Sequence, residues 1–155
     1  MQNIGYSITI EAARSPNDVF DCVNAVSLWW TKSAKEINSD RPTTFEGRSI
    51  KLNDEFILRH GDDHYSRHKV IEVMPNKKIV WRVIDSKLNW VQGNKEEWTG
   101  TKMVFEMVPR EDTTVLTFTH EGLTPHLECY EHCVHFWDMV MKIWLFDLIT
   151  HGTTK

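Results

Sequence analysis

Residues 124–149 read TPHLECYEHCVHFWDMVMKIWLFDLI, and this apolar stretch decides the fold. Thr124 is a favourable N-cap, Pro125 suits the first helical position, and Gly152 follows as a stop signal. At about 100° per residue, the apolar side chains cover roughly 200° of the helix surface, whereas an ordinary surface helix has a stripe of about 100°. Such a helix needs a large concave partner, and we expect the rest of the chain to supply it.

The preceding residues predict that partner as a set of strands. Apolar alternation, β-branched residues and turn signals bound six segments. These segments are residues 4–10, 54–60, 64–74, 78–85, 98–108 and 114–121. Ser15 and Pro16 begin a short helix, a second helical turn runs from Asn24 to Trp30, and residues 32–48 are polar and give no clear pattern.

This order of elements is typical of an α+β protein. Consecutive strands joined by short turns pair antiparallel. We therefore expect a curved antiparallel sheet of about six strands, wrapped around a long C-terminal helix, with two short helices after the first strand. At 155 residues, the chain 1–155 is expected to be a single domain.

Composition excludes several classes of function. The net charge of -4 gives no reason to expect nucleic acid, and no apolar run is long enough to span a membrane. Three cysteines without a CxxC pair and the lack of a signal peptide favour a soluble, cytoplasmic protein. No zinc spacing, phosphate-binding glycine loop or nucleophile elbow is present, so we expect no metal, no cofactor and no ATP hydrolysis.

Several stretches, taken together in order and spacing, resemble a known family. They are residues 15–20 (SPNDVF), Trp29-Trp30, 73–81 (VMPNKKIVW), 97–101 (EWTGT) with Phe105-Glu106, and 118–123 (FTHEGL) with Glu128-Cys129-Tyr130. The chain is similar to the bacterial branch of the Hsp-ninety ATPase activator homologues, within the START-like (SRPBCC) helix-grip superfamily. The resemblance covers nearly the whole chain.

The resemblance implies a helix-grip fold with a cavity between the sheet and the long helix. Members of the wider superfamily bind lipids, sterols, polyketides and plant hormones, and some catalyse cyclisation or hydrolysis. The co-chaperone that names the family carries an additional chaperone-binding domain, for which this sequence leaves no room. A role in stress response through a chaperone is therefore kept as an alternative.

The cavity would be lined by the C-terminal helix and by inward-facing strand residues. On the helix, Leu127, Val134, Met141 and Leu148 are expected to pack on the sheet. The opposing interpretation is that seven tryptophans and six methionines simply fill the space. The candidate ligand-binding residues are Trp30, Phe56, Leu58, Trp81, Val83, Asp85, Trp90, Phe105, Phe118, His120, Cys133, Phe136, Trp137, Val140 and Trp144.

Polar residues on strands add a second hypothesis. Asp85 shares parity with Trp81 and Val83, and His120 shares it with Phe118, so both are expected to point inward. Together with Arg82 or with His60, which shares parity with Phe56 and Leu58, they could orient a ligand head group or act as acid and base. Alternatively, they lie near strand ends and reach solvent, or they pair with each other.

The irregular segment 86–97 joins two strands and carries Trp90 in a polar setting. It is interpreted either as a flap over the mouth of a cavity, with Trp90 as an apolar latch, or as an ordinary long hairpin.

The leading hypothesis is a protein that binds a small apolar or amphipathic molecule between sheet and helix, without catalysis and without a catalytic residue. The alternatives are an enzyme of the polyketide cyclase or hydrolase kind using Asp85 and His120, and a stress-related protein-interaction module. A homodimer is kept as a candidate assembly.

Overall fold

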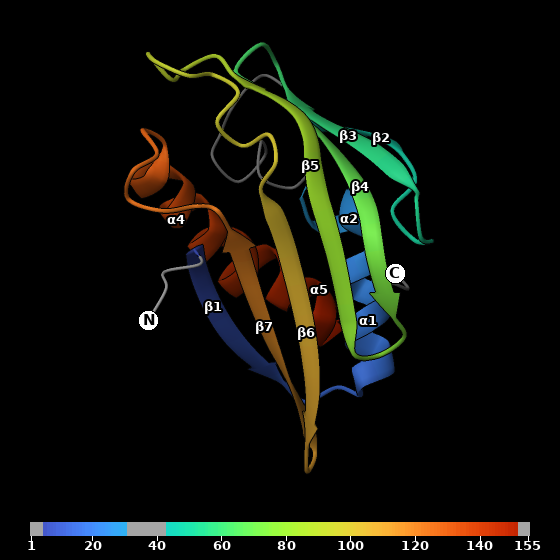
Figure 1. Cartoon of the computed structure of the whole chain (residues 1–155). Helices are drawn as coiled ribbons and strands as arrows, with labels where there is room; N and C mark the ends of the chain where they lie inside the picture. Colours follow the sequence, from blue (N-terminus) through green and yellow to red (C-terminus); the bar gives the residue numbers. More distant parts are fainter. Residues whose placement is uncertain (1–4, 31–42, 152–155) are drawn as a thin grey trace.

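The protein folds as one antiparallel sheet, and the helices that the structure describes lie on one face of it. The structure is a computed structural model that describes residues 5–30 and 43–151. The seven strands follow the order β1-β7-β6-β5-β4-β3-β2 across the sheet (Figure 1). They are β1 (Gly5–Ala12), β2 (Thr43–Gly47), β3 (Glu55–His60), β4 (His64–Met74), β5 (Lys78–Leu88), β6 (Lys102–Arg110) and β7 (Thr113–Glu121).

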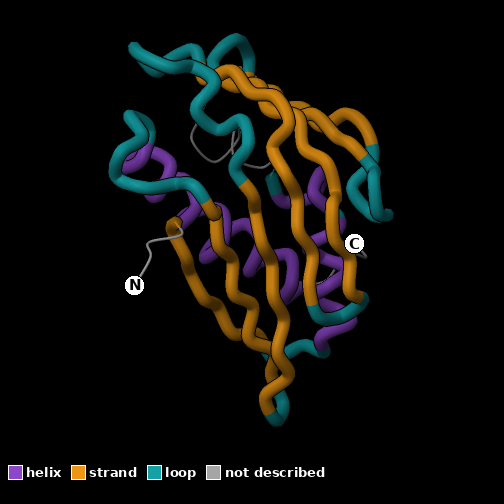
Figure 2. The backbone as a smooth tube through the Cα atoms, in the orientation of Figure 1, coloured by secondary structure: helices purple, strands orange, loops and turns teal. Residues whose placement is uncertain are grey.

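The helices form the second layer, behind the sheet in Figure 2. Two short N-terminal helices are α1 (Pro16–Asn24) and α2 (Val26–Trp29), and the C-terminal helix runs through α4 (Tyr130–Met139), η1 (Val140–Leu145) and α5 (Phe146–His151). As expected, Ser15 caps α1, because its side chain accepts a hydrogen bond from the Asp18 backbone N–H at 3.1 Å. Within the described ranges, no helix is long and apolar enough to cross a membrane.

The α+β architecture expected from the sequence is confirmed, with one strand more than the six expected. The additional strand, β2, lies in the polar stretch 32–48, of which residues 32–42 fall outside the described part. β2 is an edge strand that pairs only with β3 among the described strands. Because Thr44, Glu46 and Gly47 face solvent, β2 shows little of the apolar pattern that betrays a buried strand.

The C-terminal helix begins later than Thr124. Residues 125–129 form turns, and the helix starts at Tyr130. The backbone just before the helix is held from outside, because the Glu97 carboxylate accepts from the N–H groups of Cys129 at 2.8 Å and Glu128 at 3.2 Å. The Thr-Pro pair was therefore a wrong indicator of the helix start, which lies five residues later than Pro125.

The middle of the helix is a π-helical segment, Val140–Leu145. The N–H of Phe146 accordingly bonds the Met141 carbonyl five residues earlier. Such a segment widens the helix and changes the direction in which later side chains point. It was not foreseen, because the apolar spacing fits a regular helix equally well.

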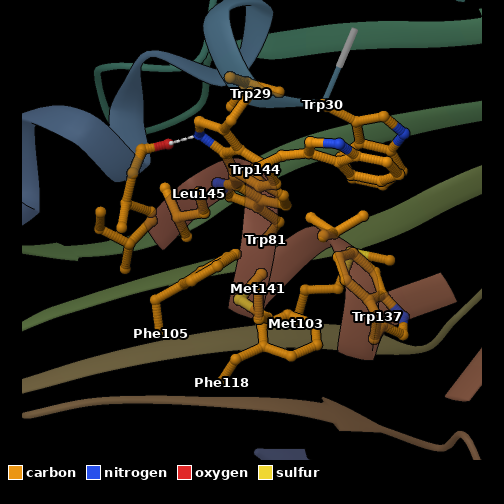
Figure 3. Packing of buried hydrophobic residues seen from close by; sticks show 14 of the residues in the cluster. Trp29, Trp30, Trp81, Met103, Phe105, Phe118, Trp137, Met141, Trp144 and Leu145 are labelled. Atoms are coloured by element: carbon orange, nitrogen blue, oxygen red, sulfur yellow. Dashed lines mark hydrogen bonds between the residues drawn. The ribbon is translucent and has the colours of Figure 1, made fainter. Parts of the chain in front are cut away.

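The centre of the interface between sheet and helix is a filled aromatic core, shown in Figure 3. Trp137 packs on Phe118 with ring centroids 4.3 Å apart, and Trp81 packs on Phe105 at 4.8 Å. Trp29 from α2 stacks on Trp81. All five side chains are buried, so this part of the interface is closed by packing.

Candidate functional site

A cavity of about 370 Å³ lies at one end of the same interface. It is bordered by the turn between β3 and β4, the end of β5, the connection from β5 to β6, and the C-terminal helix. These elements meet at the upper end of the view in Figure 1. The lining residues are Trp30, Thr43, His60, Asp63, His64, Leu88, Trp90, Trp98, His132, Cys133, Phe136 and Trp144.

Five of the fifteen candidate residues line this cavity. They are Trp30, Trp90, Cys133, Phe136 and Trp144. Three of these five, Cys133, Phe136 and Trp144, belong to the C-terminal helix. Nine others are buried in the filled part of the core instead, because the aromatic side chains close that part. These nine are Phe56, Leu58, Trp81, Val83, Phe105, Phe118, His120, Val140 and Trp137.

The inward orientation expected for Asp85 is wrong. Its side chain is exposed and its Oδ2 accepts a hydrogen bond from the Tyr65 hydroxyl at 3.1 Å. In the β4–β5 ladder, Arg67 pairs with Asp85 while the adjacent His68 pairs with Val83, so β5 contains one extra residue. This bulge reverses the alternation and turns Ser86 rather than Asp85 inward.

His120 is buried, as expected, but both of its ring nitrogens are occupied by protein. Its Nδ1 accepts from the Trp137 indole N–H at 3.1 Å. Its Nε2 lies 2.9 Å from the Thr101 hydroxyl, which itself donates to the Trp98 carbonyl, so Nε2 carries the proton. Burial lowers the pKa of His120 to about 3, which keeps the ring neutral.

Asp85 and His120 therefore do not converge. Asp85 belongs to the outer face of the sheet, and His120 contacts the C-terminal helix across the inner face. A shared acid–base role requires both groups within hydrogen-bonding reach of one substrate. The geometry gives these two residues no such arrangement.

A different histidine faces the cavity. His64 Nε2 lies 2.8 Å from the Ser66 hydroxyl, which is also 2.8 Å from His68 Nε2. Burial, and secondarily the nearby His60, lowers the pKa of His64 to about 4. Burial also lowers the pKa of His68, the inner member of this chain, well below its usual range. The cavity thus meets a neutral imidazole backed by a hydroxyl and a second imidazole.

Seven lining residues were not among the candidates: Thr43, His60, Asp63, His64, Leu88, Trp98 and His132. Four of them, His60, Asp63, His64 and Leu88, border the β3–β4 turn or the strand end beside it. The Gly61-Asp62-Asp63 turn flanked by two histidines was a visible signal, since a short hairpin brings both rings to one strand end.

The connection between β5 and β6 is held against the start of the C-terminal helix by two carboxylates. Glu128 accepts from the backbone N–H groups of Gln92 at 2.8 Å and Gly93 at 2.9 Å, and these bonds lower the pKa of Glu128. Glu97 accepts in the opposite direction from the helix start. Trp90 packs on His132 with centroids 4.5 Å apart. The segment combines both earlier interpretations: its tryptophan packs on a neighbour and also borders the cavity.

Two observations bear on the chemistry available around the cavity. Among residues 5–30 and 43–151, no group of three or more His, Cys, Asp or Glu side chains is placed to hold a metal ion. Cys133 lines the cavity, and a hydrogen bond to Cys133 together with burial raises the pKa of the neighbouring Cys129 thiol. A thiol with a raised pKa is a weak nucleophile at neutral pH.

Comparisons with known structures show the same fold across nearly the whole chain. The Aha1 dimer from Colwellia psychrerythraea has a TM-score of 0.69 and 18% identity, covering 98% of this chain and 100% of that one. Protein MLL2253 from Mesorhizobium loti gives 0.68 and 13%, covering 96% and 100%. Protein Ms6760 from Mycobacterium smegmatis gives 0.66 and 10%, covering 98% and 93%.

The sequence comparison reaches the level of the family. No curated protein matches the sequence. The family model described as "Activator of Hsp90 ATPase homolog 1-like protein" matches residues 14–143, which is most of the chain and includes both the filled core and most of the cavity wall. The chain therefore belongs to the family of activator of Hsp90 ATPase homolog 1-like proteins, with the helix-grip fold expected from its sequence.

Proposed function

We propose that the protein binds a small apolar or amphipathic molecule in the cavity between the sheet and the C-terminal helix. The observation that carries this proposal is the cavity itself, about 370 Å³ in volume and walled by aromatic rings. This volume falls within the range typical of small-molecule sites.

The energetic cost of an empty apolar space supports an occupant. At about 24 cal/mol per Å³, a dry void of this size would cost about 9 kcal/mol. The whole stability of a domain is only about 5–15 kcal/mol. The space is therefore expected to hold water, a ligand, or each in turn, and a ligand that releases water from aromatic walls gains free energy by burial.

The distribution of polar groups favours an amphipathic occupant. Trp30, Phe136 and Trp144 supply apolar wall, whereas His60, His64 and Asp63 gather at the β3–β4 turn. Trp90 is 37% exposed and borders the cavity, so one side of the site communicates with solvent. A molecule with an apolar body and one polar end matches this division.

The test is ligand-induced thermal stabilisation, with 2-isopropenylnaphthalene as a planar apolar probe and decanol as a chain-like amphipathic probe. At least one probe is expected to raise the melting temperature of the wild type. Cys133→Leu places a larger side chain in the cavity and is expected to abolish the shift. Val140→Ile, in the filled core, is the control that keeps it. If neither probe binds the wild type by calorimetry or thermal shift, the proposal fails.

Self-association is a separate proposal. The similar Colwellia psychrerythraea protein is a dimer, and the present chain shares its fold. Light scattering on the full chain is expected to show twice the mass of one chain, and a monomer at high micromolar concentration would exclude the homodimer.

A further inference from the structure

We propose that residues 89–97, in the connection from β5 to β6, form a strap across the cavity, and that local opening of this strap controls the passage of small molecules into it. Glu128, on the turn before the C-terminal helix, is the positioning residue that holds the strap closed. This inference rests on the proposed function and specifies how the same site is regulated.

One end of the strap is bonded to the β3–β4 turn. The backbone N–H of Asn89 donates to the Asp63 carbonyl at 3.0 Å, and the Asn89 side-chain amide donates to the Asp62 carbonyl. Asp63 lines the cavity. Figure 1 shows the β3–β4 turn, the β5–β6 connection and α4 at the same end of the molecule. The strap therefore begins on the sheet side of the cavity.

The other end of the strap is bonded to the approach of the C-terminal helix. The backbone N–H groups of Gln92 and Gly93 donate to the two oxygens of the Glu128 carboxylate at 2.8 and 2.9 Å. The contact is close, since a Cβ atom on Gly93 would lie 3.2 Å from a Glu128 oxygen. In return, the Cys129 N–H donates to the Glu97 carboxylate at 2.8 Å. The strap thus bridges the two sides of the cavity.

The middle of the strap supplies part of the cavity wall. Trp90 lines the cavity and packs on His132 of the helix, with ring centroids 4.5 Å apart. Trp90 is 37% exposed, whereas Trp98 and Cys133 in the same wall are 2% exposed. The strap therefore forms a side of the cavity that meets solvent, with Cys133 behind it.

The packing of the strap favours local opening. Within residues 89–97, Val91 alone is buried, while Leu88 and Trp98 on either side are anchored in the core. A segment with few buried apolar contacts and exposed backbone hydrogen bonds opens at a free energy well below that of global unfolding. The strap is accordingly held mainly by polar bonds at the surface, and it can open between two fixed ends.

The carboxylates that hold the strap stand apart from the cavity. Neither Glu97 nor Glu128 is among the described lining residues, and Glu128 is exposed. Loss of the Glu128 carboxylate should therefore raise the population of the open strap without removing a contact to a bound molecule. Entry and exit should accelerate by a similar factor, and the dissociation constant should change little.

The first experiment measures entry without any ligand, with Cys133 as the reporter. The wild type is treated with N-ethylmaleimide at fixed pH, and tandem mass spectrometry assigns the modified cysteine. Cys22, buried in the core beside Leu148, reports global unfolding. Cys133 is expected to react at least tenfold faster than Cys22, at a rate that low concentrations of urea hardly change, because local opening exposes little surface.

Variants of the strap contact then locate the gate. Glu128→Ala is expected to raise the reaction rate of Cys133 about tenfold, since the loss of two hydrogen bonds to a carboxylate shifts an opening equilibrium by roughly this factor or more. Glu128→Gln keeps one acceptor oxygen and should give an intermediate rate. Glu131→Ala removes an exposed carboxylate three residues further along and is the control that should leave the rate unchanged.

The second experiment follows 2-isopropenylnaphthalene by stopped-flow tryptophan fluorescence. Glu128→Ala is expected to raise the association and dissociation rates together, with the dissociation constant unchanged within about twofold. A faster dissociation alone, with weaker affinity, would show that Glu128 stabilises the bound state and would overturn its role as a gate.

The outcomes separate this inference from the proposed function. If Cys133 reacts no faster than Cys22 and with the same urea dependence, or if Glu128→Ala leaves its rate unchanged, the strap is not the gate, whatever the probe does. If the maleimide results are as expected but neither 2-isopropenylnaphthalene nor decanol binds, the gate stands and the proposed function fails.

Discussion

Trp137 and Trp144 lie two turns apart on one helix face, are equally buried, and belong to two different regions. Around Trp137 the interface is solid, and its indole N–H is bonded to His120. Around Trp144 the interface opens into a cavity, and its indole N–H has no partner in the described chain. Apolar burial is alike in both regions, so the two indoles differ in their surroundings and in whether the N–H group is bonded within the protein.

The histidines repeat the contrast. His120, in the solid region, has both nitrogens engaged by Trp137 and Thr101. His64, at the cavity, is engaged through Nε2, which lies 2.8 Å from the Ser66 hydroxyl. One histidine is thus enclosed between the sheet and the helix, and the other borders a cavity.

Truncation should separate the two regions most strongly. Trp137→Ala is expected to lower the free energy of unfolding by about 3–5 kcal/mol, because it leaves a void in the core and removes the donor to His120. Trp144→Ala is expected to cost at least about 1 kcal/mol less, since the enlarged cavity can rehydrate and no internal hydrogen bond is lost. Urea denaturation measures both, and equal costs would contradict the distinction.

The pH dependence of stability tests the buried imidazoles. Burial lowers the pKa of His120 to about 3 and that of His64 to about 4, so below about pH 6.5 the unfolded chain binds more protons than the folded one. The free energy of unfolding is therefore expected to be full above that pH and to fall as the pH decreases toward 4. Each imidazole contributes at most about 1.4 kcal/mol per pH unit.

The readout is the slope of unfolding free energy against pH between 6 and 4.5. His120→Gln should flatten this slope whatever its effect on overall stability. His126→Gln, on an exposed turn, is the control that should leave it unchanged. An unaltered slope for the His120 variant would show that His120 is protonated in the folded protein.

A smaller change in stability is expected at the contact between the β5–β6 connection and the start of the C-terminal helix. Glu97→Ala removes the acceptor for the backbone N–H groups of Glu128 and Cys129, just before the C-terminal helix, and should cost about 1 kcal/mol. Hydrogen exchange should also accelerate in residues 89–101 and at the helix start. Glu96→Ala, at the exposed neighbouring position, is the matched control. Identical exchange in both variants would show that Glu97 does not hold residues 89–101 against the start of the helix.

The smallest effect is expected on the outer face of the sheet. Asp85→Asn should change stability by less than about 0.5 kcal/mol, because the side chain is exposed and its bond to Tyr65 lies at the surface. Probe binding measured by calorimetry should be unchanged. A loss of binding in this variant would show that Asp85 contributes to the ligand-binding site.

The fold was predictable because the apolar residues recur at the periods of strands and of a helix. The strands 64–74 and 113–121 and the wide apolar face of the helix follow from local pattern. The start of the helix was not predictable from local pattern, because residues 125–129 form turns whose backbone is held by Glu97, some thirty residues earlier in the chain. The polar edge strand β2 was also missed. It is defined by its pairing with β3, and its own sequence shows no strand pattern.

The site was only partly predictable. Cys133, Phe136 and Trp144 followed from the helix face, but the sheet side of the cavity depended on strand geometry. One bulge in β5 turned Asp85 outward, and the β3–β4 turn brought His64 to the wall. Parity arguments fail at a bulge, and no local pattern reveals which part of an interface the aromatic rings will fill.

Indole N–H resonances offer the most direct test of the contrast between the two regions. Proton–nitrogen correlation spectra of the full chain should contain seven tryptophan indole signals, each assigned by a single Trp→Phe variant. On saturation with 2-isopropenylnaphthalene, the Trp144 signal should move, because the aromatic ring of the bound probe lies beside this cavity-lining indole, while Trp29 and Trp137 remain in place. An unmoved Trp144 signal in the saturated complex, or larger shifts at Trp29 and Trp137, would contradict the account.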